Sequence, residues 1–322
     1  MQTLLGRRII LPPLKPYVRV IPPFLVRFFA RPYVAGDSLA KAMDTAADLL
    51  VRRGLLTTLD LLAEDIETDA AVRANLDAYL RMVDAASNDP RFPTAEQRPT
   101  LSLKLSSYTT SPRQSGGSAT GSREAARQIV EAATPHGVRV TVDMESTEWT
   151  DYTLDFVRAL HAEGHAHVGC VLQTRLHRTE SDLDQLPAGC RVRLVIGIYQ
   201  EPESVALTDK VAMKERMLDF GERLLRRGHY VEFATHDEVY VRRFVDDVVP
   251  RVGVSPDRFE VQMLYGVPRQ TILADLVARG ITARLYVPFA LSWDMAISYL
   301  RRRLDEYPAM MWLVAKNLVR RG

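Results

Sequence analysis

One unit recurs along most of this chain, a short apolar segment followed by an amphipathic stretch of helical period. The apolar segments are rich in β-branched residues and read "LSLKLSS" (101–107), "RVTVDME" (139–145), "HVGCVLQ" (167–173), "VRLVIGIY" (192–199), "YVEFATHD" (230–237), "FEVQMLYG" (259–266) and "ARLYVPFA" (283–290). Near-continuous apolar strands are typical of a parallel sheet buried on both faces. Strictly alternating strands and helices therefore predict an α/β fold.

The number of units narrows the fold further. Helical stretches at 123–137, 151–164, 212–228 and 271–280 each end in glycine, a common helix stop. The segment "LLTTLDLLAE" (55–64) supplies an eighth strand, and residues 35–54 form a helix ahead of it. Eight strand–helix units predict a (βα)8 barrel. A doubly wound open sheet is the alternative, which we disfavour because no G-x-G-x-x-G follows any strand.

The N-terminal segment differs from the rest of the chain. Residues 1–36 contain six basic residues and no acidic one, with apolar residues between them. This pattern leaves two interpretations open, a Pro-broken arm packed on the domain or a peripheral contact with the inner face of the cell membrane. We expect an arm at 1–34 and one barrel domain at 35–322, because no linker divides the chain. The Ser- and Gly-rich stretch at 111–122 is predicted to be a mobile loop. It is not expected to be a phosphate-binding loop, because Ser122 stands where that motif requires Lys.

Composition excludes several classes of function. No run of eighteen apolar residues occurs, so no transmembrane helix is expected. The net charge of +2 gives no indication of nucleic-acid binding. Two cysteines provide neither a disulfide framework nor a four-cysteine metal site, and a reducing, cytoplasmic location is expected.

Polar residues gather at the predicted carboxyl ends of the strands, where barrel enzymes place their active sites. They are Lys104, Asp143, Glu145, Gln173, Tyr199, Thr235, His236, Asp237 and Tyr286. Any one of them could simply cap a helix or end a strand, but their common placement favours a functional site. No metal site is expected, because His165 and His167 precede their strand and only His236 follows one.

A cluster of arginines lies near the end of the chain, in "SYLRRRLDE" (298–306). On a final helix, Tyr299, Arg302, Arg303 and Glu306 would share one face. The spacing alone fits two interpretations, an exposed helix with ion pairs or a guanidinium clamp for a carboxylate.

These segments, in this order, resemble the bacterial, single-function proline dehydrogenase family. The resemblance runs from "AGDSLAKA" (35–42) to "YLRRRLDE" (299–306) and includes "VTVDME", "ATHD", "FEVQMLYGVP" and "LYVPF". It implies a (βα)8 barrel that oxidises L-proline to 1-pyrroline-5-carboxylate, with FAD as hydride acceptor and a quinone as the next electron acceptor. No aldehyde dehydrogenase segment is present on this chain, so a separate pyrroline-5-carboxylate dehydrogenase would follow.

The resemblance also implies roles for individual residues. The proline carboxylate would be held by Arg302 and Arg303, with Glu306 and Lys104 beside them and Asp143 paired with Lys104. The proline ring would pack on Tyr199, Leu264 and Tyr286. Arg193 would lie near the flavin N5. The remaining cofactor contacts would come from Met144, Gln173, Val195, Ile196, Gly197, Ile198, Thr235 and His236.

The chain departs from the family pattern close to the implied cofactor. Where the family usually has "VKGAY", this chain has "VIGIY", so Ile196 replaces a lysine and Ile198 an alanine. Arg175 stands in place of an aromatic residue, and Ala290 in place of a glycine. These changes leave open an alternative function, a flavin-binding or proline-sensing relative that has lost catalysis.

Overall fold

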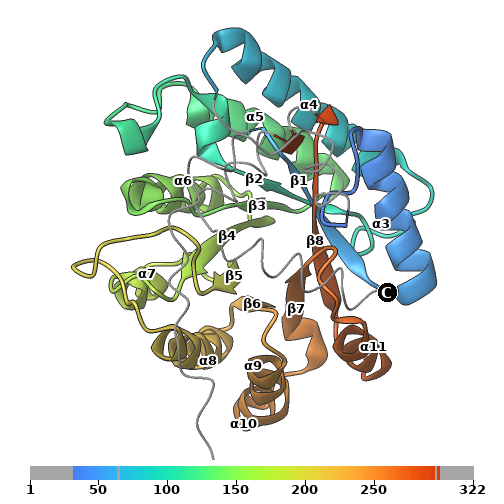
Figure 1. Cartoon of the computed structure of the whole chain (residues 1–322), viewed down its shortest axis with the longest axis vertical. Helices are drawn as coiled ribbons and strands as arrows, with labels where there is room; N and C mark the ends of the chain where they lie inside the picture. Colours follow the sequence, from blue (N-terminus) through green and yellow to red (C-terminus); the bar gives the residue numbers. More distant parts are fainter. Residues whose placement is uncertain (1–31, 64–65, 294–295, 298–322) are drawn as a thin grey trace, which may run out of the picture.

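The computed structural model describes residues 32–63, 66–293 and 296–297, and within them eight parallel strands close into a barrel (Figure 1). Each strand pairs with the next in sequence, and β8 pairs with β1. The strands are β1 (Leu56–Leu61), β2 (Thr100–Leu103), β3 (Val140–Val142), β4 (Val168–Gln173), β5 (Arg191–Val195), β6 (Tyr230–Ala234), β7 (Phe259–Leu264) and β8 (Ala283–Phe289). The predicted (βα)8 barrel is therefore confirmed, including the strand expected within 55–64.

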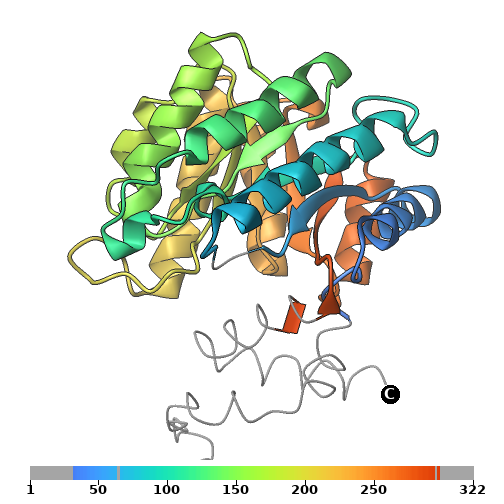
Figure 2. The ribbon, with the colours of Figure 1, turned by 90° about the horizontal axis from the view of Figure 1, so that it is seen from above.

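Helices surround the barrel on its outer side (Figures 1 and 2). The longer ones are α3 (Leu39–Arg53), α4 (Asp69–Asn88), α5 (Ser122–Ala133), α6 (Thr150–Ala162), α8 (Lys210–Arg226) and α11 (Gln270–Ala278). Shorter ones are α7 (Thr179–Asp184), α9 (Glu238–Arg242) and α10 (Val249–Val252), with a π-helical turn, η5 (Arg243–Val248), between the last two. Five 3-10 turns complete the described helices, η1 (Leu105–Tyr108), η2 (Arg113–Ser115), η3 (Thr134–His136), η4 (Thr147–Trp149) and η6 (Pro256–Arg258).

Local sequence explains where several helices begin and end. The side chains of Ser38 and Thr68 accept hydrogen bonds from the first turns of α3 and α4, and Gly54 ends α3 in the left-handed conformation. Residues 111–121 form a loop that contains η2, as expected for their composition, and Ser122 begins α5. These caps fix the ends of the helices that pack against the strands.

The core between barrel and helices is apolar. The outward-facing side chains of the strands, such as Val142, Cys170, Leu194 and Phe233, are fully buried there. They pack with apolar residues of the helices, such as Ile129, Leu160 and Leu224. Successive residues of a strand point to opposite faces, so the remaining strand residues point into the barrel.

Buried polar and charged side chains occupy much of the barrel interior, which the near-continuous apolar strands of the sequence did not indicate. Hydrogen bonds cross it between strands that are not neighbours, as from Arg193 on β5 to Ser102 on β2 (2.9 Å) and from Tyr286 on β8 to Asp143 after β3 (2.8 Å). Nearer the start of the strands, Arg284 binds Glu260 at 2.6 Å. We call the connected set the inner ion network; it comprises Asp60, Lys104, Asp143, Arg191, Arg193, Glu232, Glu260, Gln262 and Arg284.

Residues 32–36 lie across the end of β8. The Ala35 N–H donates to the Pro288 carbonyl (2.8 Å), and Tyr33 and Val34 are buried. Gly266 has φ +83°, and a Cβ there would lie 1.9 Å from the Pro32 carbonyl oxygen, so only glycine permits this crossing. The packed body thus already includes Tyr33 and Val34, which we had assigned to the N-terminal arm.

No helix in the described part of the chain has the length and apolar character needed to cross a membrane.

Candidate active site

The predicted site residues that the structure describes lie at one end of the barrel, where the strands terminate. Lys104 directly follows β2, Asp143 follows β3, and Gln173 is the last residue of β4. Further round the barrel, Tyr199 follows β5 and Thr235 and His236 follow β6, while Leu264 ends β7. Leu264 is paired in register with Tyr286 of β8. Barrel closure therefore brings together side chains that are spread over more than 180 positions of the sequence.

Asp143 is the centre of the polar contacts at this end. Its Oδ1 accepts hydrogen bonds from the Ser102 hydroxyl (2.6 Å) and from Nη1 of Arg193 (2.7 Å). Its Oδ2 accepts the hydroxyl of Tyr286 (2.8 Å) and lies 3.6 Å from Nζ of Lys104. One carboxylate thus fixes three strands and two cations around it.

Lys104 has a nearer partner than the expected Asp143. Its Nζ lies 2.8 Å from Oδ1 of Asp60 on β1, compared with 3.6 Å from Asp143. Asp60 is 2% exposed. Sequence analysis did not single out Asp60, although an acid inside the apolar run "TLDLL" was a usable signal.

The charges and hydrogen bonds around Asp143 keep its carboxylate ionised. Burial raises the pKa of Asp143, but Arg193, Lys104 and the hydrogen bonds from Ser102 and Tyr286 outweigh it, so that the pKa lies below its ordinary value. Burial lowers the pKa of Arg193, and Asp143 and Glu232 more than restore it. Burial, followed by the charge of Asp143, raises the pKa of Tyr286 well above 10, so its hydroxyl stays a hydrogen-bond donor.

Several buried polar atoms at this end have no hydrogen-bond partner within the described residues. They are Oε1 of Gln173, Nε of Arg175, Nη2 of Arg193 and Nδ1 of His236, from the ends of β4, β5 and β6. His236 accepts the Leu264 N–H at its Nε2 (3.4 Å), so its Nδ1 carries the proton. Buried polar atoms are rarely left unpaired in folded proteins. These three donors and one acceptor are the groups at this end of the barrel that could bind a polar ligand.

The loop after β5 contains a glycine that the neighbouring side chains of Gln173 and Arg175 require. Gly197 has φ +94°, and a Cβ there would lie 2.4 Å from Oε1 of Gln173 and 2.8 Å from Cδ of Arg175. The side chain of Arg175 donates a hydrogen bond to the Tyr199 carbonyl and so fixes the position of this loop. Val195 ends β5 and Ile196 is half-buried, whereas Ile198 is 48% exposed.

Two further predicted cofactor contacts have local roles in the structure. Met144 is buried directly after Asp143. The hydroxyl of Thr235 accepts the N–H of Asp237 (3.2 Å), which in turn caps α9. Both lie at the same end of the barrel as Gln173.

The predicted carboxylate clamp, Arg302, Arg303 and Glu306, lies outside the described residues, as does most of the N-terminal arm. Their roles remain predictions.

His165 and His167 precede β4, as the sequence suggested. Their rings lie edge to face, with 6.0 Å between ring centres. Among the described residues no three His, Cys, Asp or Glu side chains converge as metal ligands.

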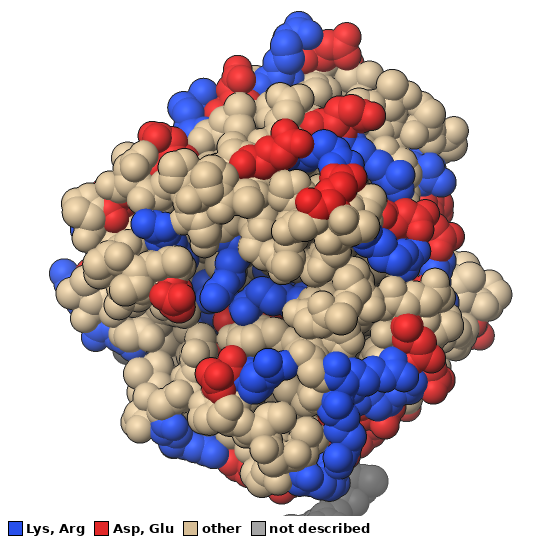
Figure 3. Space-filling model, turned by 180° about the vertical axis from the view of Figure 1, so that it is seen from behind, with Lys and Arg blue, Asp and Glu red and all other residues tan. Residues whose placement is uncertain are grey.

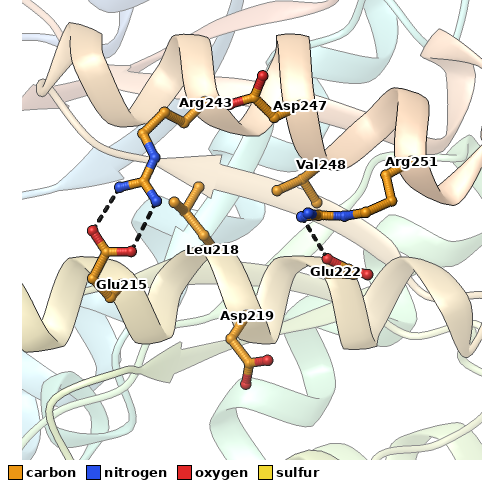
Figure 4. Close-up of a pocket in the computed structure, with 8 residues that line it drawn as sticks. All are labelled: Glu215, Leu218, Asp219, Glu222, Arg243, Asp247, Val248 and Arg251. Atoms are coloured by element: carbon orange, nitrogen blue, oxygen red, sulfur yellow. Dashed lines mark hydrogen bonds and ion pairs between the residues drawn. The ribbon is translucent and has the colours of Figure 1, made fainter.

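A separate groove of about 290 Å³ lies on the outer surface between α8 and the η5–α10 segment (Figure 4). Its two arginines pair with glutamates of α8, Arg243 with Glu215 and Arg251 with Glu222. The groove lies on the outer side of these helices, away from the carboxyl ends of the strands where the predicted site residues lie.

Comparison with known proteins gives the family. The proline dehydrogenase family model matches residues 42–312. Proline dehydrogenase of Deinococcus radiodurans is 34% identical over 298 residues, which is 90% of each chain. Proline dehydrogenase 1 of Bacillus subtilis strain 168 is 30% identical over 300 residues, 92% of each chain.

Solved structures share the fold. Proline utilization A from Bdellovibrio bacteriovorus, inactivated by N-propargylglycine, superposes with a TM-score of 0.74 at 20% identity over 86% of this chain. Proline utilization A from Corynebacterium freiburgense gives 0.72 at 21% identity over 99%. This chain spans only 32% and 36% of those longer proteins. The barrel, the family model and the similarity to relatives of matching length agree, and this chain belongs to the proline dehydrogenase family.

Proposed function

We propose that this protein oxidises L-proline to 1-pyrroline-5-carboxylate, with FAD as hydride acceptor and a quinone as the next electron acceptor. The observation that carries the proposal is the set of unpartnered polar atoms of Gln173, Arg175, Arg193 and His236, which lie at the same end of the barrel as the Asp143–Arg193–Lys104 cluster. The relatives named as proline dehydrogenases support the choice of substrate.

The residues at the strand ends fit a flavin nucleotide. A flavin ring carries both acceptors and a donor, and its nucleotide portion adds phosphate and hydroxyl oxygens. The donors on Arg193, Arg175 and His236 and the acceptor on Gln173 match that mixture. Bound FAD would supply the site for a two-electron hydride transfer, which no side chain provides.

We assign the cofactor contacts to residues of β3 to β6 and their loops. They are Met144, Gln173, Arg193, Val195, Ile196, Gly197, Ile198, Thr235 and His236, and we add Arg175 because its buried Nε has no hydrogen-bond partner among the described residues. Arg193 is the buried cation of this group, 4% exposed, and it would stabilise negative charge that develops beside it.

The substrate would lie between the cofactor and β7, β8 and β2. Tyr199, Leu264 and Tyr286 provide apolar surface for a five-membered ring. Tyr286 holds its ring in place through the hydroxyl bond to Asp143. Lys104, positioned by Asp60, provides positive charge toward the carboxylate. Holding the donor carbon in one position is what accelerates hydride transfer.

We assign the carboxylate clamp to Arg302 and Arg303, with Glu306 orienting them. Arg302→Ala or Arg303→Ala should weaken proline binding by about 2–5 kcal/mol, the cost of removing one partner of a buried charge pair. Flavin binding should be nearly unchanged, and an equal loss of flavin would contradict this assignment.

The decisive experiment is an anaerobic visible spectrum of the purified protein, reconstituted with FAD, before and after L-proline. Flavin absorption near about 450 nm that bleaches with proline would establish cofactor, substrate and hydride transfer together. D-proline serves as the matched control and should leave the absorption unchanged.

A second candidate function is a flavin-binding, proline-sensing protein without catalysis. It is favoured by Ile196 and by the exposed Ile198, which alter the loop beside the cofactor contacts. Flavin bands that shift on adding proline but do not bleach would support it. A protein that stays colourless with FAD would exclude both candidates.

We further propose a cytoplasmic protein whose product passes to a separate pyrroline-5-carboxylate dehydrogenase. For the basic N-terminal arm we propose peripheral contact with anionic membrane. Deleting residues 1–31 should abolish sedimentation with anionic vesicles and preserve activity with a soluble dye. Unchanged sedimentation would show that the arm has no such role.

A further inference from the structure

The two cysteines of this chain, Cys170 and Cys190, lie against each other. Their Sγ atoms are 4.0 Å apart, and both residues are fully buried free thiols. Neither belongs to the candidate active site. Disulfides are rare in a reducing cytoplasm, and those that do form there are usually catalytic or redox-sensing. The pair is therefore a candidate redox site in the wall of the barrel.

The register of β4 and β5 places both thiols on one face. Cys170 is the third residue of β4, and its Cα is paired with that of Val192 on β5. Cys190 precedes Val192 by two residues, so both cysteine side chains point to the outer face of the barrel. At 4.0 Å the two sulfur atoms are in van der Waals contact, and no other atom stands between them.

A disulfide requires the two sulfur atoms to approach to about 2.05 Å. Cys190 is the better placed to move, because it follows an exposed turn and precedes the first residue of β5. Ala188 and Gly189 of this turn are exposed, and a Cβ at Gly189 would have no atom within 4 Å. Rotation of the thiols about their Cα–Cβ bonds, with a small shift of this turn, would bring the sulfur atoms together while β4 and β5 stay paired.

The surroundings make the two thiols chemically different. A hydrogen bond from the Cys170 thiol, followed by one with His161 of α6, lowers the pKa of Cys190 in spite of its burial. The hydrogen bond to Cys190, together with burial, raises the pKa of Cys170 well above its ordinary value. Cys190 is therefore the thiolate of the pair, and Cys170 is the thiol that donates to it.

His161 connects this pair to the surface. Its Nε2 lies 2.8 Å from the Val168 carbonyl oxygen, which can only accept, so this nitrogen carries a proton. The hydrogen bond with Cys190 raises the pKa of His161, which favours the imidazolium beside the thiolate. Because the imidazole is only half-buried, Cys190 lies one side chain below the surface.

The charge at this end of the barrel also favours a thiolate. Cys190 lies where the strands begin, which is the face seen in Figure 3, and Lys and Arg side chains gather in the hollow at its centre. Arg191 directly follows Cys190. Glu232 opposes the ionisation of Cys190, but with a smaller effect than Cys170 or His161. Positive surroundings of this kind are typical of reactive cysteines, whose thiolate is the nucleophile.

We propose that Cys190 and Cys170 form a peroxide-reactive dithiol that closes to a disulfide between β4 and β5. The oxidant is a hydroperoxide, of which hydrogen peroxide is the simplest. The pair lies in the wall of the barrel and uses none of the proposed flavin or proline contacts, so the inference does not depend on the proposed function.

The reaction has two steps. The Cys190 thiolate attacks one oxygen of hydrogen peroxide; the O–O bond breaks, an S–O bond forms, and the hydroxide that leaves takes the proton held by His161. Cys170 then attacks the sulfur of the Cys190 sulfenic acid; the S–S bond forms, and the hydroxyl group leaves with the proton of Cys170 as water. Two thiols and one peroxide thus give one disulfide and two waters.

The test treats the reduced, full-length protein with one equivalent of hydrogen peroxide, stops the reaction with catalase and counts thiols in denaturant. Peptide mass mapping without reduction locates any disulfide, and dimedone present during oxidation traps sulfenic acid. The variants are Cys170→Ala, Cys190→Ala and His161→Gln. The matched control is His136→Gln, which removes an exposed imidazole.

We expect the thiol count of the wild type to fall from two to zero and to return with dithiothreitol. The map should show the Cys170 peptide joined to the Cys190 peptide. Cys170→Ala should accumulate sulfenic acid on Cys190, whereas Cys190→Ala should leave Cys170 reduced. His161→Gln should slow the oxidation about tenfold, the effect of one unit in the pKa of the attacked thiol, and His136→Gln should react like the wild type.

The proposal would be overturned by two thiols that persist in the peroxide-treated wild type, or by a disulfide found only between chains. Sulfenic acid trapped first on Cys170, or an unchanged rate in His161→Gln, would contradict the roles assigned to Cys190 and His161. If an alanine variant does not fold, dimedone labelling of the wild type over time still identifies the thiol that is attacked first. None of these measurements uses flavin or proline, so failure of the proposed function would leave them interpretable.

Discussion

Asp143→Asn is the substitution that most directly tests the electrostatics of the candidate active site. The change keeps the size of the side chain and removes one negative charge. Asp143 is 9% exposed, and it accepts from Ser102, Arg193 and Tyr286 within 2.6–2.8 Å. In the variant, an NH2 group would replace one carboxylate oxygen that accepts hydrogen bonds. That NH2 group would face Ser102, Arg193 or Tyr286, which are themselves donors.

The expected loss follows from the buried partners. Removing one member of a buried, hydrogen-bonded charge pair costs about 3–5 kcal/mol, because the remaining cation stays uncompensated. A domain of this kind has a free energy of unfolding of about 5–15 kcal/mol, so the loss would be a large fraction of it. At about 2–4 °C per kcal/mol, the melting temperature should fall by roughly 6–20 °C.

Urea and thermal denaturation at pH 7 would measure this loss. Asp155→Asn is the matched control, because that acid is 56% exposed and pairs only with Arg158 on the same helix. The control should change stability by less than about 1 kcal/mol. If Asp143→Asn were as stable as the control, the carboxylate would not be what holds Arg193 and Lys104, and the proposed orientation of the site would be wrong.

Two further predictions address other parts of the barrel. Gly197→Ala should reduce FAD affinity at least tenfold with a smaller change in melting temperature, because the added Cβ would meet Oε1 of Gln173. Fluorescence titration with FAD would measure the affinity. Gly253→Ala is the control for backbone strain, because Gly253 also has a positive φ but a Cβ there would have no atom within 4 Å. Glu260 has a pKa lowered from 4.5 to about 2 in the folded state, so its contribution to stability is present above pH 4.5 and is lost as the pH falls toward 2. Denaturation midpoints for wild type and Glu260→Gln should therefore converge in acid, and a constant difference would contradict the assignment.

The fold could be predicted from the sequence because the repeat is periodic and the outward faces of the strands are apolar. The helix α4 was not singled out, although Thr68 and the apolar spacing of Tyr79, Met82, Val83 and Ala86 were sufficient signals. The π-helical turn η5 could not be foreseen, because one wider turn leaves the apolar pattern of a helix nearly unchanged.

The candidate site was predictable only in part. Strand-end residues such as Asp143 and Gln173 could be found from their position after an apolar run. Their partners could not, because Asp60 reaches Lys104 only when β1 lies beside β2. The polar interior was missed for the same reason. A single charged residue within an apolar strand has no visible partner in the sequence, because its partners lie on other strands and come close only in the closed barrel.

The inner ion network also limits how this chain can diverge. Glu260 has four partners and Arg284 has two, so replacing either alone leaves a charge stranded in the barrel. Substitutions at these positions should therefore be accepted only in pairs, either by two residues that again pair with each other or by two apolar residues. The outward-facing valines and leucines carry no such constraint, so within each strand adjacent residues should evolve at different rates.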